Sequence, residues 1–145
     1  MIRNENEYQK AVNRINEENK RFEETISRLK KEGLNKKEIT RVMEPIESFH
    51  LQLKEEVESY ERLKRGEFQE MVNLRGFGHL LVCLRIAKGL SQAELAQKLG
   101  VSSSQISRDE RNEYHGITLD RANKILEVLG VQIFSKIEIA NNVAA

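Results

Sequence analysis

The residue types that usually carry covalent or metal chemistry are few in this chain and widely spaced. The single cysteine, Cys83, lies in the apolar run LLVCLRIA and cannot form an internal disulfide. We interpret it as a buried small residue and not as a nucleophile. His50, His79 and His115 have no neighbouring cysteine or carboxylate at the spacing of metal ligands. The sequence therefore predicts no metal site, no cofactor and no enzymatic activity.

Polar side chains suited to hydrogen bonding gather instead in one stretch, SQAELAQKLGVSSSQISRDER, which runs from Ser91 to Arg111. Ser91 and Glu94 have the spacing of a capping box, in which each side chain bonds the backbone amide of the other residue. This pair predicts the start of a helix. Gly100 follows the apolar residues of that helix, at a point where a left-handed residue would end it without steric strain.

A second helix is predicted to begin directly after this turn, because Ser102 and Gln105 repeat the capping-box spacing. Two capped helices about three residues apart form a helix-turn-helix. The alternative is an ordinary pair of antiparallel helices within a bundle. The apolar residues that would pack the two helices together recur at helical spacing and are Leu95, Ala96, Leu99, Val101 and Ile106.

From about Leu80 to Val131 the sequence resembles the Cro/Xre-type, lambda-repressor-like DNA-binding domain. The resemblance is carried by a small residue at the helix crossing, a glycine at the turn and a buried residue in the second helix, together with the positions between them. These residues are Gln92, Ala93, Glu94, Leu95, Ala96, Leu99, Gly100, Val101, Ser102, Gln105, Ile106 and Ser107. The resemblance implies a transcriptional regulator, expected to be a repressor, that binds double-stranded DNA as a homodimer. Its palindromic operator would have half-sites about 34 Å apart.

In such domains the second helix of the motif enters the major groove. The resemblance makes Ser103, Ser104 and Arg108 the candidates for base contacts, on the exposed face opposite Ile106. Arg108 is the most informative of the three, because a guanidinium can bond to O6 and N7 of one guanine together. The alternative for Arg108 is an exposed arginine without a partner.

The resemblance also implies contacts to the DNA backbone and one structural pair. Gln92, Ser102 and Arg111 are expected at the backbone, with the helix dipole assisting Gln92. The alternative for Gln92 is an ordinary residue beside a helix cap. Arg85 and Glu110 match a pair that forms a salt bridge between the first helix of the domain and the recognition helix, so we assign them a structural role.

Asp109 departs from the family pattern, in which an apolar or aromatic residue usually anchors the end of the recognition helix. An unpaired carboxylate is costly to bury. We therefore expect Asp109 to face water, to pair with a cation such as Arg85 or Arg111, or to tilt the helix. Tyr114 is expected either to fill the gap that Asp109 leaves or to lie near the DNA backbone.

We predict that residues 1–66 form a helical hairpin or coiled coil, which precedes the DNA-binding half, residues 76–145. Pro45 predicts that a short helix begun at Asn35 ends near Met43, and that a new helix runs to about Lys64. Asn19 occupies one position of a heptad seam, where it either fixes the register of a coiled coil or is solvated beside the next helix of the same chain. The other seam residues of the first helix are Tyr8, Val12, Ile15, Phe22, Ile26 and Leu29.

A short β-strand is predicted after Gly130, because apolar residues there alternate with polar ones. A lone strand has unpaired edges, so we expect it to pair with its copy across a dimer axis. The expected fold is thus mostly α, with one C-terminal strand. The alternating apolar residues are Val131, Ile133, Ile137 and Ile139.

The overall charge is nearly balanced, with 24 Lys+Arg and 23 Asp+Glu among 145 residues. This balance is less basic than is usual for nucleic-acid binders, so affinity for DNA would depend on a few well-placed cations and on dimerisation. No apolar run approaches the roughly 18 residues of a membrane span, and the N-terminus lacks the apolar region of a signal peptide. We therefore expect a cytoplasmic protein with no membrane partner.

A second hypothesis makes the N-terminal half the active part. Residues 1–66 would then bind a protein partner, as in antitoxins of this class or in adaptor proteins, because DNA binding does not require these amphipathic helices.

Overall fold

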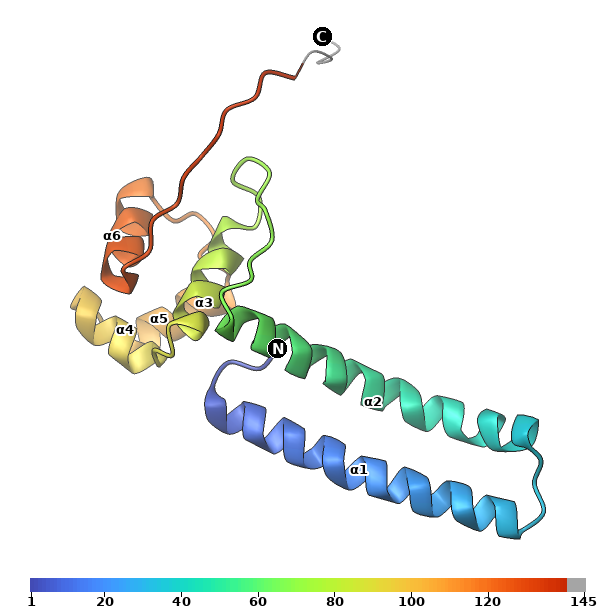
Figure 1. Cartoon of the computed structure of the whole chain (residues 1–145). Coiled ribbons are helices and arrows are strands. Elements are labelled where there is room, and N and C mark those ends of the chain that lie inside the picture. Colours follow the sequence, from blue (N-terminus) through green and yellow to red (C-terminus); the bar gives the residue numbers. More distant parts are fainter. Residues whose placement is uncertain (141–145) are drawn as a thin grey trace.

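The computed structural model describes residues 1–140, and within them the fold is all-α (Figure 1). Two long helices form an antiparallel hairpin that projects from a group of four shorter helices. No helix in this part of the chain is long and apolar enough to cross a membrane. The helices are α1 (Glu5–Lys31), α2 (Lys36–Lys64), α3 (Phe77–Ala87), α4 (Gln92–Leu99), α5 (Ser103–Arg111) and α6 (Leu119–Leu129).

The predicted C-terminal β-strand is wrong. After Gly130 the chain forms no strand as far as residue 140, and the described residues contain no sheet with which it could pair. Alternation of apolar and polar residues favours an extended local conformation, but a strand exists only where a second strand completes its hydrogen bonds. The side chains of Phe134, Ile137 and Ile139 are about nine-tenths exposed. Residues 141–145, the end of the predicted second domain, lie outside the described residues.

Each helix of the hairpin begins at a local N-cap. The Asn4 side chain accepts a hydrogen bond from the Glu7 amide at the start of α1. Asn35 and Glu38 form a complete capping box at the start of α2. Four residues connect the two helices, and this short connection makes them antiparallel neighbours.

Pro45 lies inside α2 and does not divide it, contrary to the two helices expected. Proline removes one helical hydrogen bond and crowds the preceding turn, at a typical cost of about 3 kcal/mol. The Pro45 ring is exposed, so water can satisfy the freed carbonyl. Ile39, Met43 and His50 are buried on either side of it. Packing against α1 on both sides therefore offsets the local cost, and the helix continues.

The base of the hairpin shares one hydrophobic core with the four shorter helices. Ile2, Ala11 and Tyr60 belong to the same buried cluster as Leu81 of α3 and Ile125 of α6. A separate cluster near the closed end of the hairpin contains Leu29, Ile39 and Met43. The hairpin is thus anchored to the other helices at its base, while its closed end packs only on itself.

Gly78 is required by a close approach between α3 and the loop after α5. A Cβ atom at Gly78 would lie 1.7 Å from the backbone oxygen of Glu113. Gly76 takes the left-handed conformation that precedes α3, with φ of 78°. These two glycines therefore connect the linker to the shorter helices in one defined arrangement.

Candidate nucleic-acid interface

Local caps position the helices that could face DNA. At α4, Ser91 accepts a hydrogen bond from the Glu94 amide at 3.1 Å, and Glu94 accepts one from the Ser91 amide at 2.7 Å. Gly100 ends the helix with φ of 69°. At α5, Ser102 accepts a hydrogen bond from the Gln105 amide at 3.2 Å. The Ser102 hydroxyl also lies 3.1 Å from that of Ser104. Only the bond from the Gln105 amide to Ser102 is formed at α5, so the reciprocal bond of the expected capping box is missing.

The exposed face of α5 carries the three residues expected to contact bases. Ser103, Ser104 and Arg108 are all exposed, whereas Ile106 is fully buried. Ala96 of α4 is also buried, and its small side chain permits α4 and α5 to pack closely. This arrangement presents one cation and two hydroxyl groups on a single helix surface, which is suited to hydrogen bonding with base edges.

A buried ion pair ties α5 to α3. Arg85 and Glu110 are both buried, and the guanidinium donates two hydrogen bonds to the carboxylate, one of them from Nη2 at 2.9 Å. Arg85 Nη1 also donates to the carbonyl oxygen of Leu90 at 2.7 Å. Both charges are therefore paired and hydrogen-bonded, as burial of charge requires. The pair fixes the C-terminal part of α5 against the start of the motif.

Gln92 joins this network and does not project freely toward solvent. Its Nε2 donates to Glu110 Oε2 at 2.7 Å, and its side chain is partly buried. Gln92 lies at the N-terminal end of α4, where backbone amides and the helix dipole favour anions. The other expected backbone contacts, Ser102 and Arg111, lie at the two ends of α5 and are exposed.

Asp109 forms an ion pair with Arg121 of α6, and not with either cation named from the sequence. Both side chains are partly exposed, so the carboxylate is neither buried alone nor free in solvent. The bond spans 12 residues and links the last turn of α5 to the first turn of α6. No spacing rule within one helix could have identified Arg121, because the contact joins two separate helices that the tertiary fold brings together.

Comparison with known families agrees with this geometry. Residues 84–134 match the family model described as helix-turn-helix, which covers the end of α3, the motif and α6. The match supports a Cro/Xre-type helix-turn-helix domain in this part of the chain. A domain of this kind supports a DNA-binding transcription regulator in general. Comparisons with curated proteins and with solved structures gave no match.

Tyr114 lies in the interior of the helix-turn-helix domain, beside the last turn of α5. This position agrees with the expectation that it packs inside the domain and not with the expectation that it lies near the DNA backbone. Its ring is buried, and its amide donates to the Asp109 carbonyl oxygen at 2.7 Å. Burial raises the pKa of the Tyr114 hydroxyl well above its ordinary value, and the nearby carboxylates of Glu110 and Asp109 raise it further. Tyr114 is therefore a core residue and not a DNA contact.

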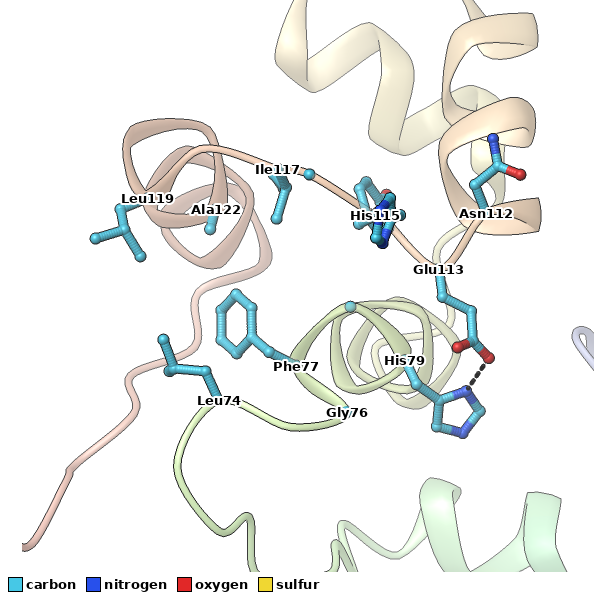
Figure 2. A pocket seen from close by; sticks show the side chains of 13 residues that line it. Leu74, Gly76, Phe77, His79, Asn112, Glu113, His115, Ile117, Leu119 and Ala122 are labelled. Carbon is cyan, nitrogen blue, oxygen red and sulfur yellow. Dashed lines mark ion pairs between the residues drawn. The ribbon is translucent and has the colours of Figure 1, made fainter. Parts of the chain in front are cut away.

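A cavity of about 320 Å³ adjoins this loop, and Asn112, the C-cap of α5, is among its lining residues (Figure 2). Phe77, Leu74 and Leu119 line one side of it. On the other side His79 Nδ1 lies 3.5 Å from a carboxylate oxygen of Glu113. The cavity is open to solvent and separates the linker from the loop between α5 and α6. It lies apart from the candidate base contacts.

Proposed function

We propose that the protein is a repressor that binds a palindromic operator as a homodimer, with α5 of each copy in the major groove. The exposed face of α5 carries this proposal, because Ser103, Ser104 and Arg108 lie together on it while Ile106 fixes the opposite face in the core. Ser102 and Arg111 would contact the DNA backbone at the two ends of the helix. Gln92 would contact a phosphate through the N-terminus of α4 while its side chain supports Glu110.

Dimerisation is supported by the charge balance and by the size of the reading surface. One copy offers a single arginine among its three candidate base contacts, and the chain carries a net charge of only +1. Two copies related by a two-fold axis double both the base contacts and the phosphate contacts. The half-sites of the operator would then lie about 34 Å apart, centre to centre.

Selection of binding sites from random duplex DNA tests the proposal. We expect an enriched palindrome with a guanine at an equivalent position of each half-site. Arg108→Ala should lower the affinity for that site by about 1 to 3 kcal/mol per half-site, while leaving the affinity for unrelated duplexes nearly unchanged. Arg111→Ala is the matched control, since loss of a phosphate contact weakens binding to all sequences alike. Failure to enrich any site, or equal effects of the two variants, would contradict the proposal.

A second candidate function, the binding of a protein partner by the hairpin, is supported by an exposed apolar stripe on α2. Val42, Ile46 and Phe49 follow the i, i+4, i+7 spacing of a helix face, and Phe49 is 78% exposed. Grooves in partner proteins commonly bind amphipathic helices through such a stripe. The partner would be a small protein with an apolar groove, as expected for a toxin neutralised by its antitoxin.

Co-expression with the products of adjacent genes tests this second candidate. A partner should form a stoichiometric complex with the full-length chain on gel filtration, and Phe49→Ser should dissociate it without changing DNA binding. Leu51→Ser is the matched control, because Leu51 is also exposed on α2 but lies outside the stripe. A complex that survives Phe49→Ser would exclude the stripe as its binding surface.

A further inference from the structure

Positive charge is concentrated at the closed end of the hairpin, far from α5. We define the hairpin tip as residues 28–41, the last turn of α1, the connection and the first turns of α2. The tip has six cations and two carboxylates and hence a net charge of +4, whereas the whole chain has a net charge of +1. All six cations are exposed, and they are Arg28, Lys30, Lys31, Lys36, Lys37 and Arg41.

The two carboxylates of the tip leave this charge largely uncompensated. Glu38 accepts a hydrogen bond from the Asn35 amide as part of the capping box. Glu32 lies 3.9 Å from Arg28, at the limit of an ion pair. Within the described residues, none of the four lysines of the tip forms an ion pair, and neither does Arg41.

Helix stability does not explain all of these cations. Lys30 and Lys31 lie at the C-terminal end of α1, where the helix dipole favours positive charge. Lys36 and Lys37 are the first two residues of α2, where the same dipole disfavours positive charge. An anion outside the chain would remove this unfavourable interaction, so the position of the two lysines points to an anionic partner.

The surface of the tip suits the backbone of a polyanion better than a small enclosed anion. Lys36, Lys37, Thr40 and Arg41 line an open hollow of about 490 Å³. Their charged groups are exposed, and Asn35 already satisfies the free amide of Glu38 at this helix end. Mobile, exposed lysines contribute to binding mainly by displacing counterions from phosphates, with no base preference.

The hairpin joins the helix-turn-helix domain beside the turn that precedes α4, whose N-terminus we propose to contact a phosphate. Figure 1 shows the C-terminal end of α2 next to the turn between α3 and α4. A Cβ atom at Gly89, in that turn, would lie 3.5 Å from Lys64 Nζ at the end of α2. The 29 residues of α2 span about 43 Å. The tip thus lies about one length of α2 from the start of α4, a distance comparable to one helical turn of DNA, about 34 Å.

We propose that the hairpin tip binds the DNA backbone that flanks the half-site read by α5. This proposal rests on the proposed DNA-binding function and adds a second, sequence-independent contact to it. The contact lengthens the DNA segment that each copy covers. It also supplies positive charge that the nearly neutral helix-turn-helix half lacks, since residues 76–145 carry eight Lys+Arg and seven Asp+Glu.

The salt dependence of DNA binding tests this contact in the full-length protein. The tip variant combines Lys31→Gln, Lys36→Gln and Lys37→Gln. The control variant combines Lys10→Gln, Lys20→Gln and Lys54→Gln, which removes the same charge from exposed positions elsewhere on the hairpin. Fluorescence anisotropy would measure affinity between about 50 and 200 mM salt, on a duplex with the selected site at its centre and long flanks, and on one trimmed to the site.

On the long duplex, the tip variant should reduce the slope of log affinity against log salt by about 2 to 3 for each bound copy, while the control variant keeps the wild-type slope. On the trimmed duplex the wild type and the tip variant should coincide. The melting temperature of the tip variant should equal or exceed that of the wild type, because the lysines at the start of α2 oppose the dipole.

Equal slopes for the tip and control variants on the long duplex would overturn the proposal. So would a defect of the tip variant confined to phosphatidylserine vesicles, which would identify an anionic membrane as the partner. If selection yields no operator, the proposed repressor function fails, but the same slopes measured on a long random duplex still decide whether the tip binds DNA.

Discussion

The ion pair between Arg85 and Glu110 is the contact that most directly fixes α5 against α3. Breaking a buried pair by removing one charge typically costs about 3 to 5 kcal/mol, because the remaining charge stays buried without a partner. Glu110→Gln should therefore lower the free energy of unfolding by about that amount in urea titrations. The double variant Arg85→Met, Glu110→Met should recover most of the loss, since no uncompensated charge remains.

An exposed carboxylate of the same domain gives the control for this prediction. Glu113→Gln removes a partner of His79 at the surface and should change stability by less than about 1 kcal/mol. If Glu110→Gln were as mild as Glu113→Gln, the pair would not be the anchor of α5.

Gly78 gives a second prediction at the residue scale. Gly78→Ala would place a Cβ atom against the backbone of the loop after α5, and overpacking of this kind costs about 1 to 3 kcal/mol or more. Gly100→Ala is the comparison, because Gly100 has positive φ but open space around it, so only the backbone strain of about 1 to 2 kcal/mol applies. Urea unfolding should rank Gly78→Ala as the more damaging; the reverse order would show that the loop yields easily.

At the scale of single residues, the sequence predicts the features that local rules control, such as helix caps and left-handed turns. Ser91, Ser102 and Gly100 lie where capping and left-handed conformations require them. The bond from Gln92 to Glu110 and the ion pair of Asp109 with Arg121 span 18 and 12 residues. Such contacts depend on how separate helices pack, so no pattern within one helix could predict them.

Among the helices, α1 and α2 are joined by a polar contact that should depend on pH. The Glu18 carboxylate accepts hydrogen bonds from His50 Nδ1 and from Arg14 Nε, both at 2.8 Å. These bonds, first that of His50 and then that of Arg14, lower the pKa of Glu18 below its ordinary value. A carboxylate whose pKa is lower in the folded state stabilises the fold above its ordinary pKa, near 4.3, and loses this effect as pH falls through the folded pKa.

The melting temperature should therefore fall as the pH is lowered from about 5 to 3, and the fall should be smaller in Glu18→Gln than in the wild type. Glu23→Gln removes an exposed carboxylate of α1 and serves as the control. Parallel pH profiles for the wild type and Glu18→Gln, measured by circular dichroism, would rule out this contribution.

The two errors in predicting elements have different physical causes. At Pro45 the local rule predicted a helix end, but burial of Met43 and His50 against α1 stabilises the continuous helix. After Gly130 the alternating pattern describes a preference of the chain, while a strand requires a partner that the helical fold does not supply. Both cases show tertiary context overriding a correct local preference.

For the whole molecule, the shared core argues against two independently folding halves. Tyr60 of α2 is buried in the same cluster as Leu81 of α3, and Tyr8 stacks on Tyr60 with ring centroids 5.1 Å apart. Unfolding of the shorter helices would expose the base of the hairpin, so the two parts stabilise each other. Calorimetry of the full-length protein should therefore show one cooperative transition.

The hairpin tip should nevertheless open locally before the rest of the chain unfolds. The small cluster of Leu29, Ile39 and Met43, at and beside the tip, is separate from the main core, and few apolar contacts there resist opening. Hydrogen exchange measured by mass spectrometry should give lower protection for peptides covering residues 26–43 than for those covering residues 8–15 or 53–63. Two calorimetric transitions, or equal protection along the hairpin, would contradict this view. Local opening of the tip would leave the base of the hairpin packed against the shorter helices.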